Sequence, residues 1–217
     1  MVISGLPITY GDVALTAPQP VVIRPAIPAD AEQIAAIFAH YVATSVATFE
    51  EVPPTAADWR RRLGELGRQN LPFLVAEGDR GDQRGQEGLR DQRVLRDQRG
   101  LRGEADRDTG TVCGYAYASP WRPKPAYRYT VEDTVYVSPG HTGRGLGSAL
   151  LGGLLAGCAA AGARQVIAVI ADTGSDVSAA LHRRFGFAEA GRLSEVGRKH
   201  DRWIDTVLMQ RDLTASC

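Results

Sequence analysis

A strand, a tight turn and the start of a helix follow one another directly in residues 129–151, YTVEDTVYVSPGHTGRGLGSALL. Val, Tyr and Thr alternate with two acids over residues 131–137, a pattern typical of a β-strand. The Pro-Gly pair at 139–140 ends that strand, and leucines at 146, 150 and 154 then recur at helical spacing. A strand that leads straight into an apolar helix predicts a mixed α/β domain.

Glycine occupies positions 143, 145 and 147, where this helix begins. Without Cβ atoms, backbone N–H groups can approach an anion closely, and the positive end of the helix attracts it. A dinucleotide fingerprint needs glycine where Ser148 stands, and the Gly-Lys-Ser/Thr of a P-loop is absent. The hypothesis is therefore a pyrophosphate-binding loop of another kind, and the alternative is a glycine-rich turn that binds nothing.

Length and charge narrow the function classes. The chain has 217 residues, enough for one domain with tails, and its 25 basic and 25 acidic residues cancel. A neutral chain argues against a nucleic-acid partner. No apolar run reaches about 18 residues, so we expect a cytoplasmic protein without membrane contact. The three cysteines, at 113, 158 and 217, are widely spaced, which predicts free thiols and no metal site.

The remaining patterns extend the domain on both sides. They predict the order strand, two helices, three strands, helix, strand, helix, two strands, and so a single α/β domain with a mixed α+β sheet over residues 21–213. The apolar run at 165–171 is typical of a buried central strand. The strands outside the first stretch are expected at 21–27, 73–77, 111–119, 165–171, 187–197 and 202–213.

Two helix starts carry capping patterns. Asp30 with Gln33, and Thr55 with Asp58, have the spacing of capping boxes. The arginines at 60–62 follow the second box, and we interpret them as a solvated helix face.

Residues 79–110 differ from the rest of the chain. They contain eight arginines, eight acids and a near-hexapeptide repeat, and they lack aromatic residues. Such a low-complexity polyampholyte buries too little apolar surface to offset its ordering entropy. We expect a disordered insertion between two hairpin strands, with partner binding as the alternative, and a flexible tail at 1–20.

A basic, aromatic loop precedes the first stretch. Residues 120–130, PWRPKPAYRYT, hold three prolines, three aromatic residues and three cations. The cations suit a carboxylate or phosphoryl group, and the aromatic side chains suit the walls of a small-molecule site. The alternative is an ordinary proline-rich surface turn.

Three motifs together resemble the GNAT acetyltransferases. They are V-x-P-x3-G-x-G-x-G at 137–147, S-x2-L-H-x3-G-F at 178–187 and GRLSEVGRKHDRW at 191–203. With TVEDTVYV at 130–137, the chain resembles most closely the phosphinothricin and methionine sulfoximine N-acetyltransferase branch. The resemblance implies the GNAT acyl-CoA N-acyltransferase fold. It also implies acetyl transfer from acetyl-CoA, without a metal, to the α-amino group of a small amino acid analogue.

That reaction requires proton transfers. An ammonium group cannot attack a thioester until it loses a proton, so a carboxylate is needed as general base. Glu132 is favoured over Asp133, mainly by the resemblance, and its ordinary pKa of about 4.3 must rise by burial or a water must relay the proton. His182 stands where many relatives place a tyrosine acid, and it is the expected proton donor to the leaving thiolate. The alternative for His182 is a packed histidine.

The resemblance also implies binding residues. The backbone of residues 135–137 would pair with the pantetheine arm, and the N–H groups of 143–148 would take the pyrophosphate. Thr142 and Ser175 replace the residues usual in the superfamily at those positions. The expected cofactor set is Val135, Tyr136, Val137, Thr142, Gly143, Arg144, Gly145, Leu146, Gly147, Ser148 and Ser175, and the acceptor set is Phe49, Trp121, Lys124 and Tyr127.

Two further expectations concern the oligomeric state of the protein and the alternatives to the proposed reaction. The C-terminal hairpin would help to build a homodimer with its active sites near the interface. The competing functions are acetylation of another small amine and a non-catalytic CoA-binding regulatory module, in which residues 79–110 would bind the partner.

Overall fold

The computed structural model describes residues 21–78 and 110–214. The predictions of a flexible tail at 1–20 and of disorder at 79–109 therefore lie outside the described residues, as does Cys217. Within the described ranges the chain forms seven strands and four α-helices, namely β1 (Val22–Pro25), α1 (Ala31–Thr44), α2 (Ala56–Arg68), β2 (Phe73–Gly78), β3 (Thr111–Pro120), β4 (Thr130–Val137), α3 (Leu146–Ala160), β5 (Gln165–Ala171), α4 (Val177–Arg184), β6 (Ala188–Lys199) and β7 (Arg202–Asp212).

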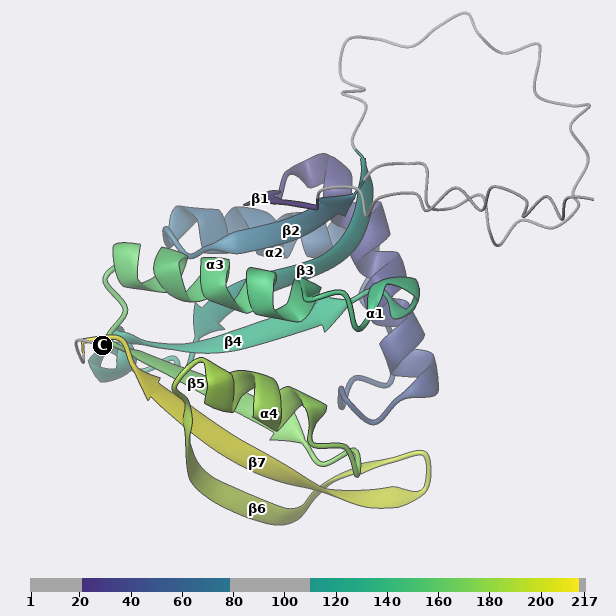
Figure 1. Cartoon of the computed structure of the whole chain (residues 1–217), viewed down its shortest axis with the longest axis vertical. Helices are drawn as coiled ribbons and strands as arrows, with labels where there is room; N and C mark the ends of the chain where they lie inside the picture. The colour runs from purple at the N-terminus through teal and green to yellow at the C-terminus, as the bar shows by residue number, and fades with distance from the viewer. Residues whose placement is uncertain (1–20, 79–109, 215–217) are drawn as a thin grey trace, which may run out of the picture.

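The strands form one mixed sheet in the order β1-β2-β3-β4-β5-β7-β6. Only β4 and β5 are parallel neighbours, and the other pairs are antiparallel. Helices α3 and α4 cover one face of this sheet, and α1 and α2 cover the other (Figure 1). The order of the elements and the mixed sheet confirm the predicted fold class.

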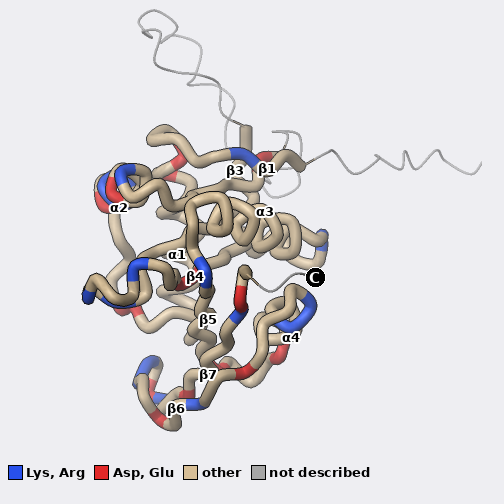
Figure 2. Tube along the Cα trace, turned by 90° about the vertical axis from the view of Figure 1, so that its left-hand side faces the viewer, with Lys and Arg blue, Asp and Glu red and all other residues tan. Residues whose placement is uncertain are grey.

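Each face of the sheet has its own core. The leucines predicted to share a face of α3, at 146, 150 and 154, are buried, and Figure 2 shows α3 without a charged residue. The opposite core, under α1 and α2, is rich in aromatic side chains, and Trp59 of α2 lies edge-on to Phe38 and Tyr115. Cys113 and Cys158 are buried free thiols, as expected. No helix among residues 21–78 and 110–214 is long and apolar enough to span a membrane.

Strands β4 and β5 diverge after a short paired segment. Their register runs only from Thr130↔Gln165 to Glu132↔Ile167, although β4 continues to Val137 and β5 to Ala171. The strand is central in the sheet and buried at residues 166–168, as predicted, but the prediction of burial is wrong at Val169. Val169 is 41% exposed, and it lies beyond Ile167, the last residue of β5 that is paired with β4.

One of the two predicted capping boxes is confirmed. Thr55 and Asp58 exchange backbone-to-side-chain hydrogen bonds of 2.9 and 3.2 Å at the start of α2. The Asp30 box is wrong: its carboxylate accepts from the backbone N–H of Ile27 and pairs with Arg24, while the side chain of Gln33 accepts from the N–H of Val112. Tertiary partners outcompete the local cap at this position.

The insertion lies where it was expected in the topology. Strands β2 and β3 are antiparallel neighbours, and Gly78 and Thr111 face each other at the end of their register. Residues 79–110 therefore connect two adjacent strands.

Candidate active site

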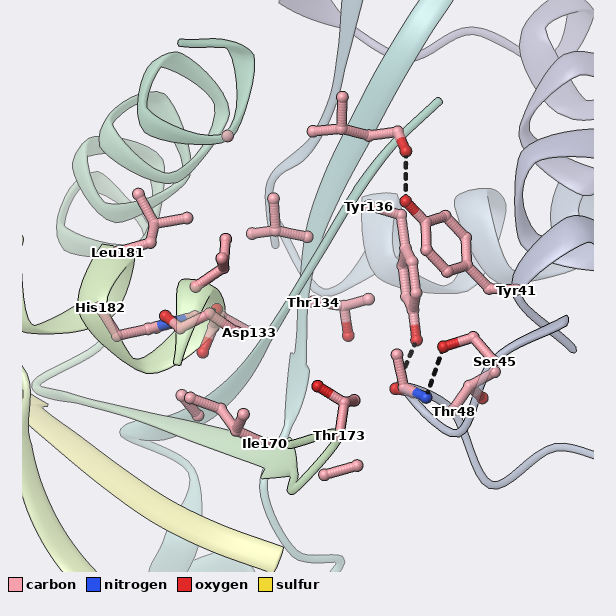
Figure 3. Close-up of a pocket in the computed structure, with 18 of the residues that line it drawn as sticks. Tyr41, Ser45, Thr48, Asp133, Thr134, Tyr136, Ile170, Thr173, Leu181 and His182 are labelled. Atoms are coloured by element: carbon pink, nitrogen blue, oxygen red, sulfur yellow. Dashed lines mark hydrogen bonds and ion pairs between the residues drawn. The ribbon is translucent and has the colours of Figure 1, made fainter. Parts of the chain in front are cut away.

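A cavity of about 1050 Å³ opens where β4 and β5 diverge. Its walls come from helices α1, α2 and α4, the loop at 45–50, strands β3, β4, β5 and β7, and the glycine loop with the first turn of α3. Figure 3 shows the pair Asp133 and His182 on the α4 side of β4, and Tyr41 and Tyr136 on the α1 side. The cavity thus reaches both faces of the sheet through the divergence of the two parallel strands.

The open edge of β4 carries free backbone groups at alternate residues. The N–H of Ser138 donates to the carbonyl of Cys113 at 2.8 Å, which makes Val137 and Gly114 a non-hydrogen-bonded pair. The backbone groups of Val135 and Val137 therefore point away from β3, whereas those of Tyr136 point toward it. The backbone of Tyr136 is therefore not available to a ligand on the open edge, and the predicted pairing with the pantetheine arm is restricted to Val135 and Val137 as a prediction.

The side chain of Tyr41 occupies one of the backbone groups on this open edge. Its hydroxyl donates to the carbonyl of Val137 at 2.6 Å. The groups that remain on the open edge are the N–H and carbonyl of Val135 and the N–H of Val137. The sequence carries no local signal of this contact, because Tyr41 and Val137 are 96 positions apart.

The three glycines of the loop serve two different purposes. Gly143 and Gly145 have φ values of 76° and 80°, a backbone conformation that L side chains rarely adopt. A Cβ at Gly147 would lie 3.3 Å from Leu181 of α4, so this glycine permits close helix packing. The first N–H groups of α3 have no partner within the helix, which suits an anion.

Most of the expected cofactor set lines the cavity. The exception is Arg144, an exposed residue of the loop that is not among the lining residues. The lining members are Val135, Tyr136, Val137, Thr142, Gly143, Gly145, Leu146, Gly147, Ser148 and Ser175.

Glu132 lies on the face of β4 that α1 and α2 cover, together with Thr134 and Tyr136. Burial raises the pKa of its carboxyl group, the charge of Asp133 raises this pKa further, and the positive charge of Arg122 lowers it. A carboxylate with a raised pKa takes up a proton more readily near neutral pH. Asp133 lies on the opposite face, as expected from strand alternation, and is buried.

His182 is buried with both ring nitrogens engaged. Nδ1 lies 2.7 Å from the carbonyl of Ser178, and Nε2 lies 3.0 Å from Oδ2 of Asp133. Burial alone would lower the pKa of His182, but its hydrogen bond to Asp133, the charge of Asp133 and the Ser178 carbonyl together raise it. The ring packs edge-on against Phe187, so the geometry favours the packed-histidine alternative, although His182 does line the cavity.

The expected acceptor residues separate into two groups. Phe49 lines the cavity, whereas Trp121, Lys124 and Tyr127 do not. Their loop, which includes a short 3-10 helix (Pro125–Tyr127), precedes β4, while the cavity opens toward the other end of that strand. Arg122 of this loop acts on the site through its positive charge, which lowers the pKa of Glu132.

Arg62 is a cavity residue that the sequence pattern did not reveal. Its guanidinium lies 4.9 Å from the ring of Trp59 and 5.5 Å from that of Tyr117, and it donates to the Tyr117 hydroxyl at 3.0 Å. The solvated-face interpretation holds for Arg60 and Arg61 and is wrong for Arg62. The available signal was its spacing of three residues from Trp59, which places both on one side of α2.

The loop at 45–50 is attached to the C-terminal hairpin. The buried Lys199 donates to the carbonyl of Thr48 at 2.8 Å. A Cβ at Gly197 would lie 2.5 Å from the ring of Phe49, so only glycine allows this ring its place. The Tyr136 hydroxyl also donates to the carbonyl of Ala47. Long-range contacts of this kind carry no local sequence signal.

In the part of the chain that the structure describes, no three His, Cys, Asp or Glu side chains are grouped to hold a metal ion.

The chain is similar in sequence to known acetyltransferases. Residues 57–187 match the Acetyltransferase (GNAT) family. The chain is 42% identical over 186 residues to a phosphinothricin N-acetyltransferase of Alcaligenes faecalis, covering 86% of this chain and 79% of the relative. It is 33% identical over 191 residues to an L-methionine sulfoximine/L-methionine sulfone acetyltransferase of Pseudomonas aeruginosa, covering 88% and 94%.

A solved structure extends the agreement to three dimensions. A GNAT superfamily phosphinothricin acetyltransferase from Sinorhizobium meliloti, in complex with AcCoA, superposes with a TM-score of 0.72 at 38% identity, covering 91% of this chain and 92% of that one. The motifs, the diverging strands and these similarities lead to one conclusion: the chain belongs to the GNAT acetyltransferase family.

Proposed function

We propose that this protein transfers the acetyl group of acetyl-CoA to the α-amino group of a small amino acid analogue such as phosphinothricin, methionine sulfoximine or methionine sulfone. The observation that carries the proposal is the position of Glu132, a carboxylate of raised pKa in the same cavity as the glycine loop. The names of the relatives, at 33–42% identity, support the acceptor class.

The described residues fit acetyl-CoA, which supplies an activated acetyl thioester. The N–H and carbonyl of Val135 lie on the unpaired edge of β4, where an extended amide arm can add like a strand. The N–H groups at the start of α3 suit the pyrophosphate, and the left-handed Gly143 and Gly145 bring this backbone close. We propose these contacts as the cofactor site.

Glu132 has the role of general base. At neutral pH the acceptor amine is an ammonium ion, and Glu132 accepts its proton so that the nitrogen lone pair becomes available. The role of His182 as proton donor to the departing thiolate stays a prediction. It would require Nε2 to exchange its hydrogen bond with Asp133 for one to the sulfur.

The test is release of free CoA thiol from acetyl-CoA by the purified full chain. The acceptor panel contains phosphinothricin, methionine sulfoximine, methionine sulfone, ordinary amino acids, spermidine and an aminoglycoside. We expect selective turnover of the first three. Turnover of another amine alone would keep the reaction and reject the acceptor class, and CoA binding without any turnover would reject the enzyme proposal.

We also propose a homodimer and a cytoplasmic location. The hairpin of β6 and β7 exposes large apolar side chains that a partner would cover, with Leu193, Val196 and Trp203 exposed by 45, 53 and 62%. Light scattering after gel filtration measures the mass in solution, and a monomer would reject the dimer.

The proposed cytoplasmic location agrees with the buried free thiols of Cys113 and Cys158, which are typical of a reducing compartment.

A further inference from the structure

Arg62 differs from its two neighbours in α2. Arg60 pairs with Glu32 and Arg61 pairs with Asp58, both on the outer surface of the helix. Arg62 turns inward to the cavity, and no carboxylate within residues 21–78 and 110–214 forms an ion pair with it. A half-buried guanidinium that neutralises no acid of the described protein is suited to neutralise an acid of a ligand.

The side chain of Arg62 is held in one place before any ligand arrives. Trp59 and Tyr117 contact its guanidinium, and the Tyr117 hydroxyl accepts one of its five N–H groups. A planar guanidinium fixed in this way loses little entropy when it binds a carboxylate through two parallel hydrogen bonds. The remaining N–H groups are the available donors.

Arg62 and Glu132 lie on the same side of the sheet. Tyr117 faces Thr134 in the β3–β4 register, and Glu132 is two residues away along β4 on the same face. Tyr117 and Glu132 are thus diagonal neighbours, about 7–8 Å apart, and the guanidinium of Arg62 lies beside Tyr117. Arg62, Tyr117 and Glu132 all line the same cavity, so one ligand in this cavity can present its amine to Glu132 and an acidic group to Arg62.

We infer that Arg62 determines specificity by binding the anionic group of the acceptor while Glu132 receives the proton of its amine. This inference rests on the proposed function, and it moves the anion site from the loop at 120–130 to α2. Arg62 and Arg184 are the only Arg or Lys residues that line the cavity, and Arg184 belongs to α4 on the opposite face. The anion is either the α-carboxylate or an acidic side-chain group such as a phosphinate.

The experiment compares Arg62→Met and Arg62→Lys with the matched control Arg61→Met, whose side chain is 66% exposed. Arg62→Met should raise KM for the acceptor about 10- to 100-fold, because a charge-assisted bidentate contact is lost. The KM for acetyl-CoA should stay unchanged, and Arg62→Lys should lie between wild type and Arg62→Met. Arg61→Met should behave like wild type.

Three acceptors distinguish the two sources of the anion. Methionine sulfone has only the α-carboxylate, its carboxamide has no anion, and phosphinothricin adds a phosphinate. If Arg62 binds the α-carboxylate, the defect appears with methionine sulfone and vanishes with the carboxamide. If it binds the side-chain acid, the defect appears only with phosphinothricin.

Two results would overturn the inference. One is an acceptor KM of Arg62→Met equal to that of Arg61→Met with every acceptor. The other is an equal rise in KM for acetyl-CoA together with a lower melting temperature, which would show a structural role alone. If wild type turns over none of the acceptors, calorimetric binding of methionine sulfone and phosphinothricin in the presence of CoA decides instead. Weaker binding to Arg62→Met supports the inference, and equal or absent binding overturns it.

Discussion

Nε2 of His182 lies 3.0 Å from Oδ2 of Asp133, and this contact joins α4 to β4 at the cavity. The carbonyl of Ser178 can only accept a hydrogen bond, so the Nδ1 that lies 2.7 Å from it must donate. If Nε2 also carries a proton, the pair is an imidazolium and a carboxylate buried together. Oδ1 of Asp133 has no hydrogen-bond partner among the described residues. His182 is therefore the main group that offsets the cost of burying this carboxylate.

His182→Gln should therefore destabilise the fold, and by more at low pH than at high pH. Removing one partner of a buried ion pair costs about 3–5 kcal/mol. The folded pKa of His182 is raised, so its contribution is complete below the unfolded value of about 6.5 and is lost as pH rises through the folded pKa. Urea unfolding of wild type and variant at pH 6 and pH 9 measures the difference.

Arg183→Gln serves as the control, because its ion pair with Asp176 is exposed. A His182→Gln variant with unchanged stability and a lower kcat would contradict the packed role and support the proton donor.

Glu132→Gln should lower kcat about 100-fold at neutral pH while the affinity for CoA stays unchanged. In the wild type, kcat/KM should fall as pH decreases through the raised pKa of Glu132, because the protonated base cannot accept a proton. The pH profile of thiol release measures this limb. A variant that retains the wild-type rate and profile would eliminate Glu132 as the base.

The same substitution has a predictable effect on stability. The folded pKa of Glu132 exceeds its unfolded value of about 4.3, so ionisation costs stability as pH rises through this interval. At neutral pH, Glu132→Gln should melt at the same temperature as wild type or higher. Glu189→Gln, at an exposed position of β6, is the control. A lower melting temperature for Glu132→Gln, with that of Glu189→Gln unchanged, would contradict the predicted direction of the stability change.

Local patterns predicted the elements of this fold because each has a signal within its own segment. The alternation of residues 131–137, the glycine loop and the leucines of α3 are examples, and all lie as expected. The divergence of β4 from β5 has no such signal, since it depends on the pairing of two distant segments. The contact of Lys199 has no local signal for the same reason, since its partner Thr48 lies 151 residues away in the sequence. For Arg62 the local signal was limited to its spacing from Trp59, and its hydrogen-bond partner Tyr117 lies 55 residues away.

Replacing residues 79–110 by Asn-Gly should leave turnover close to that of the full chain and should not lower its stability. Gly78 and Thr111 already face each other across the β2–β3 pair, and Asn-Gly favours a tight hairpin turn. Each halving of a loop lowers the free energy of its closure by about 0.6 kcal/mol, so the shorter loop favours the folded state. Thermal melting and thiol release check both properties. Loss of folding or of activity would show that the insertion has a structural or functional role, which the neutral repeat does not predict.

Gly197→Ala should impair acceptor binding without affecting acetyl-CoA. The new Cβ would lie 2.5 Å from the ring of Phe49, so the ring must leave its position in the cavity wall. Lys199→Met should act in the same direction, because it removes the bond from Nζ to the Thr48 carbonyl that holds this loop. Both variants should raise KM for the acceptor and leave KM for acetyl-CoA unchanged, as measured by thiol release.

Gly191→Ala is the matched control for Gly197→Ala. Both glycines belong to β6, and a Cβ at Gly191 meets no atom within 4 Å. Wild-type kinetics for Gly191→Ala together with a raised acceptor KM for Gly197→Ala would assign the effect to Phe49 rather than to strand propensity. Equal kinetics for the two glycine variants would mean that the attachment of the loop at 45–50 to the hairpin does not shape the acceptor site. In that case Lys199 contributes to stability alone, and Lys199→Met should lower the melting temperature without changing either KM.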